Sequence, residues 1–148
     1  MNSKLVFLFI LISFNTSVLA CSCAKSEIED AYENFDYIFK GKVTSVEPSN
    51  KSSFNKIKFD VYHSYKGPES NIRDVFSHQS GATCGYSFEL GSEYIVFSFK
   101  GNKEWEKIGI ALDEKPMVSL CSLTQPLNVV DKQLINTIRF LDNVKNDS

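Results

Sequence analysis

The middle of the chain alternates apolar and polar side chains in the way that a strand facing a core does. In the stretch KIKFDVYHSYKG, residues 56–67, Ile57, Phe59 and Val61 fall on one face with polar residues between them. His63 continues this apolar face, and we expect it to be packed or to lie at a rim rather than to be catalytic. The pattern predicts a β-strand.

Four other segments carry shorter versions of the same pattern. Residues 37–48 are rich in β-branched and aromatic side chains, and Gly41 within them predicts a bulge or a bend. Trp105, in the last of the four, is expected to cover one end of the core. The other three predicted strands are residues 71–80, 92–100 and 105–113.

Two segments have helical spacing instead. In residues 26–36, Ser26 is a candidate N-cap and Glu29 follows three residues later, which is the pattern of a capping box. Residues 127–144 predict an amphipathic helix packed on the sheet, because their apolar residues recur at helical intervals. These are Val130, Leu134, Ile138 and Leu141.

Five short strands with helices at the ends indicate a mainly β fold. The chain contains 12 Phe and 6 Tyr, and such residues favour strands. We expect a small five-stranded barrel of the oligonucleotide/oligosaccharide-binding (OB) type, closed or partly closed, with flanking helices.

The first twenty residues have the three parts of a secretory signal. Lys4 supplies a positive charge, an apolar run follows, and Val18 and Ala20 occupy the positions that a signal peptidase reads. We therefore expect residues 1–20 to be a signal peptide and residues 21–148 to form one domain. The protein is expected to be secreted or extracytoplasmic, in the periplasm or cell envelope if its source is a bacterium.

The cysteines of the expected mature chain are even in number, which in an exported chain predicts two disulfides. A bridge between Cys21 and Cys23 closes too small a ring. The other two cysteines are Cys84 and Cys121. Either of the two remaining pairings therefore ties the N-terminal segment to two distant points of the domain.

Three other uses of the Cys-x-Cys start remain open. One is a redox pair, although no thioredoxin-like βαβ pattern surrounds it. A zinc site could combine it with His63 or His78, although neither histidine lies in a paired motif. An acyl anchor on Cys21 would make the protein an envelope lipoprotein and would leave one thiol unpaired. The net charge of −2 offers nucleic acid no basic face, and no membrane contact is expected unless Cys21 is lipidated.

Three stretches together resemble a known family. They are ACSCA, DYIFKGKVTSV and CGYSFELGSEYIVF…SLCSLTQPL, and the resemblance covers most of residues 21–127. They are similar to the netrin-like domain of the tissue inhibitors of metalloproteinases, in a one-domain form. The resemblance implies a five-stranded OB-type barrel and the disulfide pairs Cys21–Cys84 and Cys23–Cys121. The chain departs from the family in AKSEIEDAYEN, which lacks a further cysteine and a proline-rich connection, and in having one predicted helix instead of a second disulfide-rich subdomain.

The resemblance also implies a mechanism in which the inhibitor binds the zinc of its target in trans. Catalytic zinc keeps an open position, and an α-amino group has a pKa of about 8, so its neutral form is accessible. The amine and carbonyl oxygen of Cys21 would chelate that zinc, and the side chain of Ser22 would enter the pocket for the substrate residue after the cut. The implied protease-contact residues are Cys21, Ser22, Cys23, Ala24, Ala82, Thr83 and Cys84.

The function predicted from the sequence is therefore inhibition of a zinc metalloprotease. The alternatives are a non-inhibitory netrin-like binding module and an envelope lipoprotein acylated at Cys21. An enzyme is not expected, because the loop GATCG and His78 lack a third group that would orient them as a nucleophile–base pair. No cofactor is expected.

Overall fold

The computed structural model describes residues 21–24, 26–50, 52–68 and 74–147. The expected signal peptide, Lys25 and the first three residues of the predicted strand 71–80 lie outside them. The described elements are α2 (Ile28–Asn34), β1 (Tyr37–Pro48), β2 (Phe54–Lys66), β3 (Asp74–His78), the 3₁₀ turn η2 (Gly81–Thr83), β4 (Glu93–Lys100), α3 (Lys103–Lys107), β5 (Pro116–Met117), β6 (Gln125–Pro126) and α4 (Lys132–Asn146).

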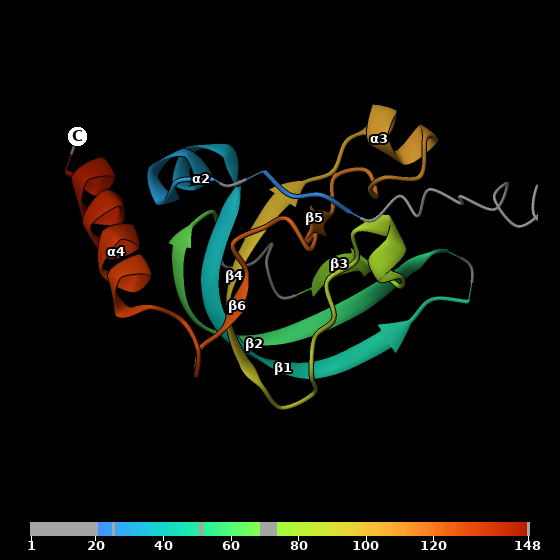
Figure 1. Ribbon diagram of the computed structural model, residues 1–148, viewed down its shortest axis with the longest axis horizontal. Coiled ribbons are helices and arrows are strands. Elements are labelled where there is room, and N and C mark those ends of the chain that lie inside the picture. Colours follow the sequence, from blue (N-terminus) through green and yellow to red (C-terminus); the bar gives the residue numbers. More distant parts are fainter. Residues whose placement is uncertain (1–20, 25, 51, 69–73, 148) are drawn as a thin grey trace, which may run out of the picture.

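Five of the strands close into a barrel, as the sequence predicts (Figure 1). Hydrogen bonding runs from β1 to β2, β3, β5 and β4, and β4 pairs back with β1. All neighbours are antiparallel except β3 and β5, which are parallel where Phe76 faces Met117. The short β6 pairs with Tyr94 and Ile95 of β4, on the side of β4 opposite β1.

Strand β1 closes the barrel because it bends at Gly41. Its whole length pairs with β2, and its first half, Tyr37–Lys42, also pairs with β4. The register with β2 shifts between Lys40 and Gly41, which confirms the predicted bulge. A Cβ atom at Gly41 would lie 2.8 Å from the carbonyl oxygen of Asp60, so a larger residue does not fit this close approach.

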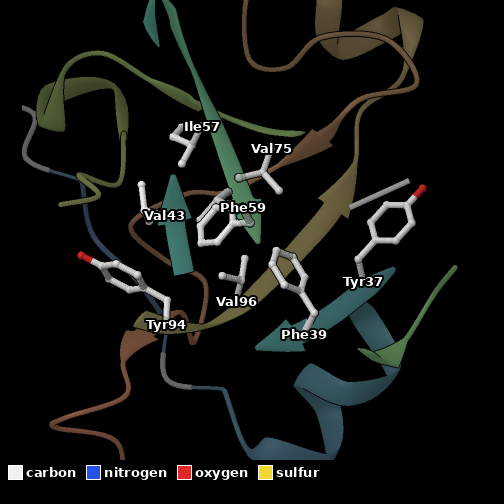
Figure 2. Close-up of a cluster of buried hydrophobic side chains, with 9 residues drawn as sticks. Tyr37, Phe39, Val43, Ile57, Phe59, Val75, Tyr94 and Val96 are labelled. Atoms are coloured by element: carbon white, nitrogen blue, oxygen red, sulfur yellow. The ribbon is translucent and has the colours of Figure 1, made fainter. Parts of the chain in front are cut away.

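Alternate residues of the strands fill the interior of the barrel (Figure 2). The rings of Phe39 and Phe59 meet edge to face with 5.3 Å between centroids. This cluster is the barrel core that the alternating pattern predicts. Its buried members are Tyr37, Phe39, Val43, Ile57, Phe59, Val75, Tyr94, Val96 and Val118.

Some of the intervening residues of β1 and β4 are buried too, on the outside of the barrel. Ile38, Ile95 and Phe97 lie in a second apolar cluster with residues of α2 and α4. Leu134 and Ile138 of α4 are buried there, which confirms the predicted amphipathic helix. Because β4 is covered on both faces, its residues 94–98 are all buried and show no alternation.

The fifth strand of the barrel is not where the sequence placed it. Residues 105–113 were expected to be a strand, but they belong to the helix α3 and the turn after it, and β5 at Pro116–Met117 takes the strand position. The side chain of Asn102 caps α3 by accepting a hydrogen bond from the backbone N–H of Trp105 over 2.9 Å. Gly109 has φ 74°, which breaks an extended backbone.

Three smaller expectations have different outcomes. The capping box is wrong: α2 begins at Ile28 with Glu27 at the N-cap, and the structure shows no side-chain cap there. Trp105 covers one end of the core only in part, because it is 39% exposed; its ring packs edge to face on that of Phe99, with 5.5 Å between centroids. His63 is exposed, and its ring meets that of Tyr65 edge to face with 4.4 Å between centroids.

Candidate functional site

Two disulfides hold the N-terminal segment against two distant parts of the barrel. Cys21 is bonded to Cys84 with 5.5 Å between Cα atoms, and Cys23 is bonded to Cys121 with 5.1 Å. These are the pairs that the family resemblance implies. The segment that begins at Cys21 therefore runs past β5 and lies beside the loop that contains η2 (Figure 1).

Local hydrogen bonds give the η2 loop one defined conformation. The hydroxyl of Ser80 accepts from the backbone N–H of Ala82 over 3.2 Å, and the hydroxyl of Thr83 donates to the carbonyl of Ser80 over 2.9 Å. Cys84 then adopts a left-handed conformation at φ 59° and donates its N–H to the carbonyl of Gly81. The turn thus directs Cys84 toward Cys21 without support from a longer helix.

Gly85 connects this loop to the chain around the second disulfide. It forms an isolated antiparallel bridge with Ser119, and the N–H of Leu120 donates to the carbonyl of Cys84 over 2.8 Å. A Cβ atom at Gly85 would lie 2.1 Å from the carbonyl oxygen of His78, so only glycine fits. The two cysteines that receive the N-terminal segment, Cys84 and Cys121, therefore stand on hydrogen-bonded neighbouring segments.

Residues 21–24 and 82–84 make up what we call the N-terminal ridge. The side chains between and beside the disulfides are exposed, whereas Cys21 and Cys84 are half-buried. The structure thus brings the predicted contact residues into two adjoining exposed segments. The exposed residues are Ser22, Cys23, Ala24, Ala82 and Thr83.

Acidic side chains lie just beyond the ridge. Glu27 occupies the N-cap of α2, and Glu29 and Asp30 lie in its first turn, all exposed. Their carboxylates interact favourably with the positive N-terminal end of the helix. A partner that reaches past Ala24 meets this negative charge.

The zinc site that uses the Cys-x-Cys pair is wrong, because both thiols are consumed in disulfides. Within the described residues, no group of three or more His, Cys, Asp or Glu side chains could hold a metal ion. His78 is instead structural. Its Nε2 atom lies 3.0 Å from the carbonyl oxygen of Ile110, and its ring centroid lies 4.3 Å from that of Phe54. The disulfide of Cys21 also leaves it no free thiol for an acyl chain.

One residue at this site was missed by the sequence reasoning. Leu120 stands next to Cys121, is 47% exposed, and is hydrogen-bonded to the ridge through its backbone. Its position directly before a bonded cysteine was the available signal. In the described part of the chain, no helix is both long enough and apolar enough to cross a bilayer.

Comparison with known proteins adds a further finding. No family model matches the chain. Metalloproteinase inhibitor 2 of Homo sapiens is 30% identical over 129 residues, which cover 79% of this chain and 54% of the relative. The protein of the same name from Cricetulus longicaudatus is also 30% identical, with 61% of its length covered, and that from Oryctolagus cuniculus is 27% identical over 128 residues.

The chain is similar to metalloproteinase inhibitor 2. This similarity supports the resemblance to the tissue inhibitors of metalloproteinases that the motifs carry. The chain spans little more than half the length of the relatives that it matches. By name these relatives are inhibitors of metalloproteinases, which supports the prediction that this chain is not an enzyme.

Proposed function

We propose that the protein inhibits zinc metalloproteinases, and that its mature form begins at Cys21 and chelates the catalytic zinc of the target. The observation that carries this proposal is the double clamp of the N-terminal segment by Cys21–Cys84 and Cys23–Cys121. The similarity to metalloproteinase inhibitor 2 over 129 residues supports the same activity. The partner is a zinc metalloproteinase, and the metal belongs to that partner.

The chemistry needs a free α-amino group at Cys21. A neutral amine and the carbonyl oxygen of the same residue form a five-membered chelate ring, and zinc in a protease has an open position that they can fill. The amine must be unprotonated, which an ordinary α-amino pKa of about 8 allows near neutral pH. Signal-peptide cleavage after Ala20 supplies this group.

The disulfides make the chelating residue a rigid ligand. A flexible chain end would lose conformational entropy when it bound the metal, and this loss would weaken binding. Here Cys21 and Cys23 are both anchored by disulfides. The segments that carry their bonding partners are joined by the hydrogen bond from the N–H of Leu120 to the carbonyl of Cys84. Most of the ordering cost is therefore met when the protein folds.

The remaining ridge residues extend the contact on either side of Cys21. Ser22 is exposed between the two anchored cysteines, so its side chain can enter the pocket that follows the zinc in a protease cleft. Ala82 and Thr83 are exposed directly before Cys84 and lie beside the chelating residue through the Cys21–Cys84 bond. The ridge therefore offers a narrow surface to a narrow cleft.

The test compares the mature chain starting at Cys21 with a variant that has one alanine added before it. Both are assayed against a panel of zinc metalloproteinases, and thermal unfolding serves as the control for the fold. We expect the native form to inhibit and the extended form to lose inhibition at an unchanged melting temperature, because an amide nitrogen is a poor zinc ligand. Equal inhibition by both forms would refute chelation by Cys21.

Mass spectrometry of the natural protein separates the alternatives. A free N-terminus at Cys21 with two disulfides is the expected result, whereas a diacylglycerol mass on Cys21 would establish the lipoprotein. If the correctly processed chain inhibits no protease in the panel, the proposal of an inhibitor falls and that of a non-inhibitory binding module takes its place.

A further inference from the structure

An apolar pocket of about 510 Å³ opens directly beside the N-terminal ridge. Thr83 and Cys84 line it from the η2 side, and Ile108 and Ile110 line it from the turn that follows α3. Its lining also includes buried residues of the barrel, Met117 and Val118.

The turn that forms the far wall is held at its base. The N–H of Gly101 donates to the carbonyl of Lys115 over 2.9 Å, and the N–H of Glu114 donates to the carbonyl of Gly101 over 3.0 Å. A Cβ atom at Gly101 would lie 1.9 Å from the carbonyl oxygen of Leu112, so the two ends of the loop are in close backbone contact. The loop therefore leaves and re-enters the barrel at one fixed point.

The same turn is also held near its tip. Nε2 of His78, in β3, lies 3.0 Å from the carbonyl oxygen of Ile110, and with Nε2 protonated it donates a hydrogen bond. The N–H of Ile110 donates to the carbonyl of Trp105 over 2.9 Å. The pocket wall is thus formed before any partner arrives, which reduces the ordering cost of using it.

The walls expose apolar surface that the fold itself does not use. Ile108 is 68% exposed and Ile110 is 50% exposed. Both side chains are aliphatic, and only Gly109 separates them in the chain. Leu120 lies in the turn between two residues of the lining, Ser119 and Cys121, and is 47% exposed. A cluster of exposed aliphatic side chains around a pocket is typical of a surface that is covered in a complex.

We infer that this pocket is a second contact for the inhibited metalloproteinase, and that it receives an aliphatic or aromatic side chain from the rim of the protease cleft. The inference rests on the proposed function. Thr83 and Cys84 belong to both the ridge and the pocket, and Cys84 is bonded to Cys21. A protease whose zinc is held at Cys21 therefore lies next to the mouth of the pocket.

The pocket would act on selectivity more than on the chelation itself. Every zinc protease offers the metal, but the side chains on the rim of its cleft differ from one enzyme to another. A protease with an apolar side chain at this point of the rim gains buried apolar area, and one with a charged side chain there must desolvate it without a partner.

The test is the substitution Ile108→Asp in the mature chain, with Leu90→Asp as its matched control. Leu90 is 70% exposed, lies in the turn before β4 and is outside the pocket lining. We expect Ile108→Asp to raise the inhibition constant about tenfold or more for the best-inhibited protease, because it places a carboxylate in an apolar contact. We expect Leu90→Asp to change it less than about twofold, and both variants to unfold at the temperature of the parent.

The outcomes separate the two proposals. If Ile108→Asp inhibits as well as the parent, or if Leu90→Asp weakens inhibition equally, the pocket contact is overturned while chelation by Cys21 stands. If the parent chain inhibits none of the proteases, both proposals fall. A loss confined to Ile108→Asp, of different size for different proteases, supports a contact that determines selectivity.

Discussion

The backbone N–H of Leu120 donates to the carbonyl oxygen of Cys84 over 2.8 Å. This hydrogen bond joins the two places where the N-terminal segment is anchored, because Cys84 is bonded to Cys21 and Leu120 precedes Cys121, which is bonded to Cys23. The anchors cannot separate without breaking this hydrogen bond and the bridge between Gly85 and Ser119. The position of Cys21 therefore follows from the fold of the barrel.

Removal of the second disulfide tests how much the clamp contributes. With Cys21–Cys84 intact, the bond between Cys23 and Cys121 closes an effective loop of roughly 40 residues, so the double variant Cys23→Ala/Cys121→Ala should lose roughly 4 kcal/mol of unfolding free energy. Denaturant unfolding measures this loss. The inhibition constant of the folded variant should rise, because Ser22 is then anchored only on its N-terminal side, through Cys21. Unchanged inhibition by a folded variant would show that the clamp is dispensable.

A pair of glycines in one loop gives a second prediction. Gly85→Ala places a Cβ atom 2.1 Å from the carbonyl oxygen of His78, and backbone must move to admit it. We expect a loss of about 1–3 kcal/mol in unfolding free energy, together with weaker inhibition, because the neighbouring Cys84 is displaced. Gly81→Ala is the control, since a Cβ atom there meets nothing within 4 Å. Its stability should be unchanged or slightly higher. Equal losses in the two variants would contradict the steric explanation.

The barrel could be predicted because its strands obey a simple rule. In β2, Ile57 and Phe59 face the core and Asp60 faces solvent, so the period of two in the sequence matches burial. The amphipathic helix α4 was predicted for the same kind of reason, because Leu134 and Ile138 recur on its buried side. Where burial on one face determines the pattern, the pattern identifies the element.

The same rule gave the wrong answer at residues 105–113. Ile108, Ile110 and Leu112 alternate as in a strand, but the first two point outward at the pocket and Gly109 turns the backbone between them. Their apolar character reflects a surface feature and not a core. A hydrophobic pattern alone does not distinguish these two origins.

The candidate site was predictable in its residues more than in its shape. The motifs around Cys21, Cys84 and Cys121 identified the segments of the N-terminal ridge through family resemblance. The spacing of the cysteines alone left two disulfide pairings open. The pocket was not predictable, because its lining comes from β3, the η2 loop, β4, the turn after α3 and the chain after β5. Only the closed barrel brings these segments together.

Alkaline titration gives a prediction for the barrel end near Tyr86. The ring centroid of Tyr86 lies 4.7 Å from that of Phe88 and 6.2 Å from that of Tyr94. Burial of the phenol, with a smaller contribution from charge on Tyr94, raises the pKa of Tyr86 to about 12 from its ordinary value of 10.0. The folded state therefore keeps a proton that the unfolded state releases first.

The sign of the effect on stability follows from this order of release. Below pH 10 both states hold the proton, and the group contributes its full stabilisation; as the pH rises from 10 toward 12, only the unfolded chain releases it, so the free energy of unfolding falls. Tyr86→Phe removes this contribution. Denaturant unfolding at about pH 9 and about pH 11 should therefore show a larger loss for the parent chain than for Tyr86→Phe. Parallel losses in the two proteins would mean that the phenol of Tyr86 titrates alike in the folded and unfolded states, and that the ring is open to water at this end of the barrel.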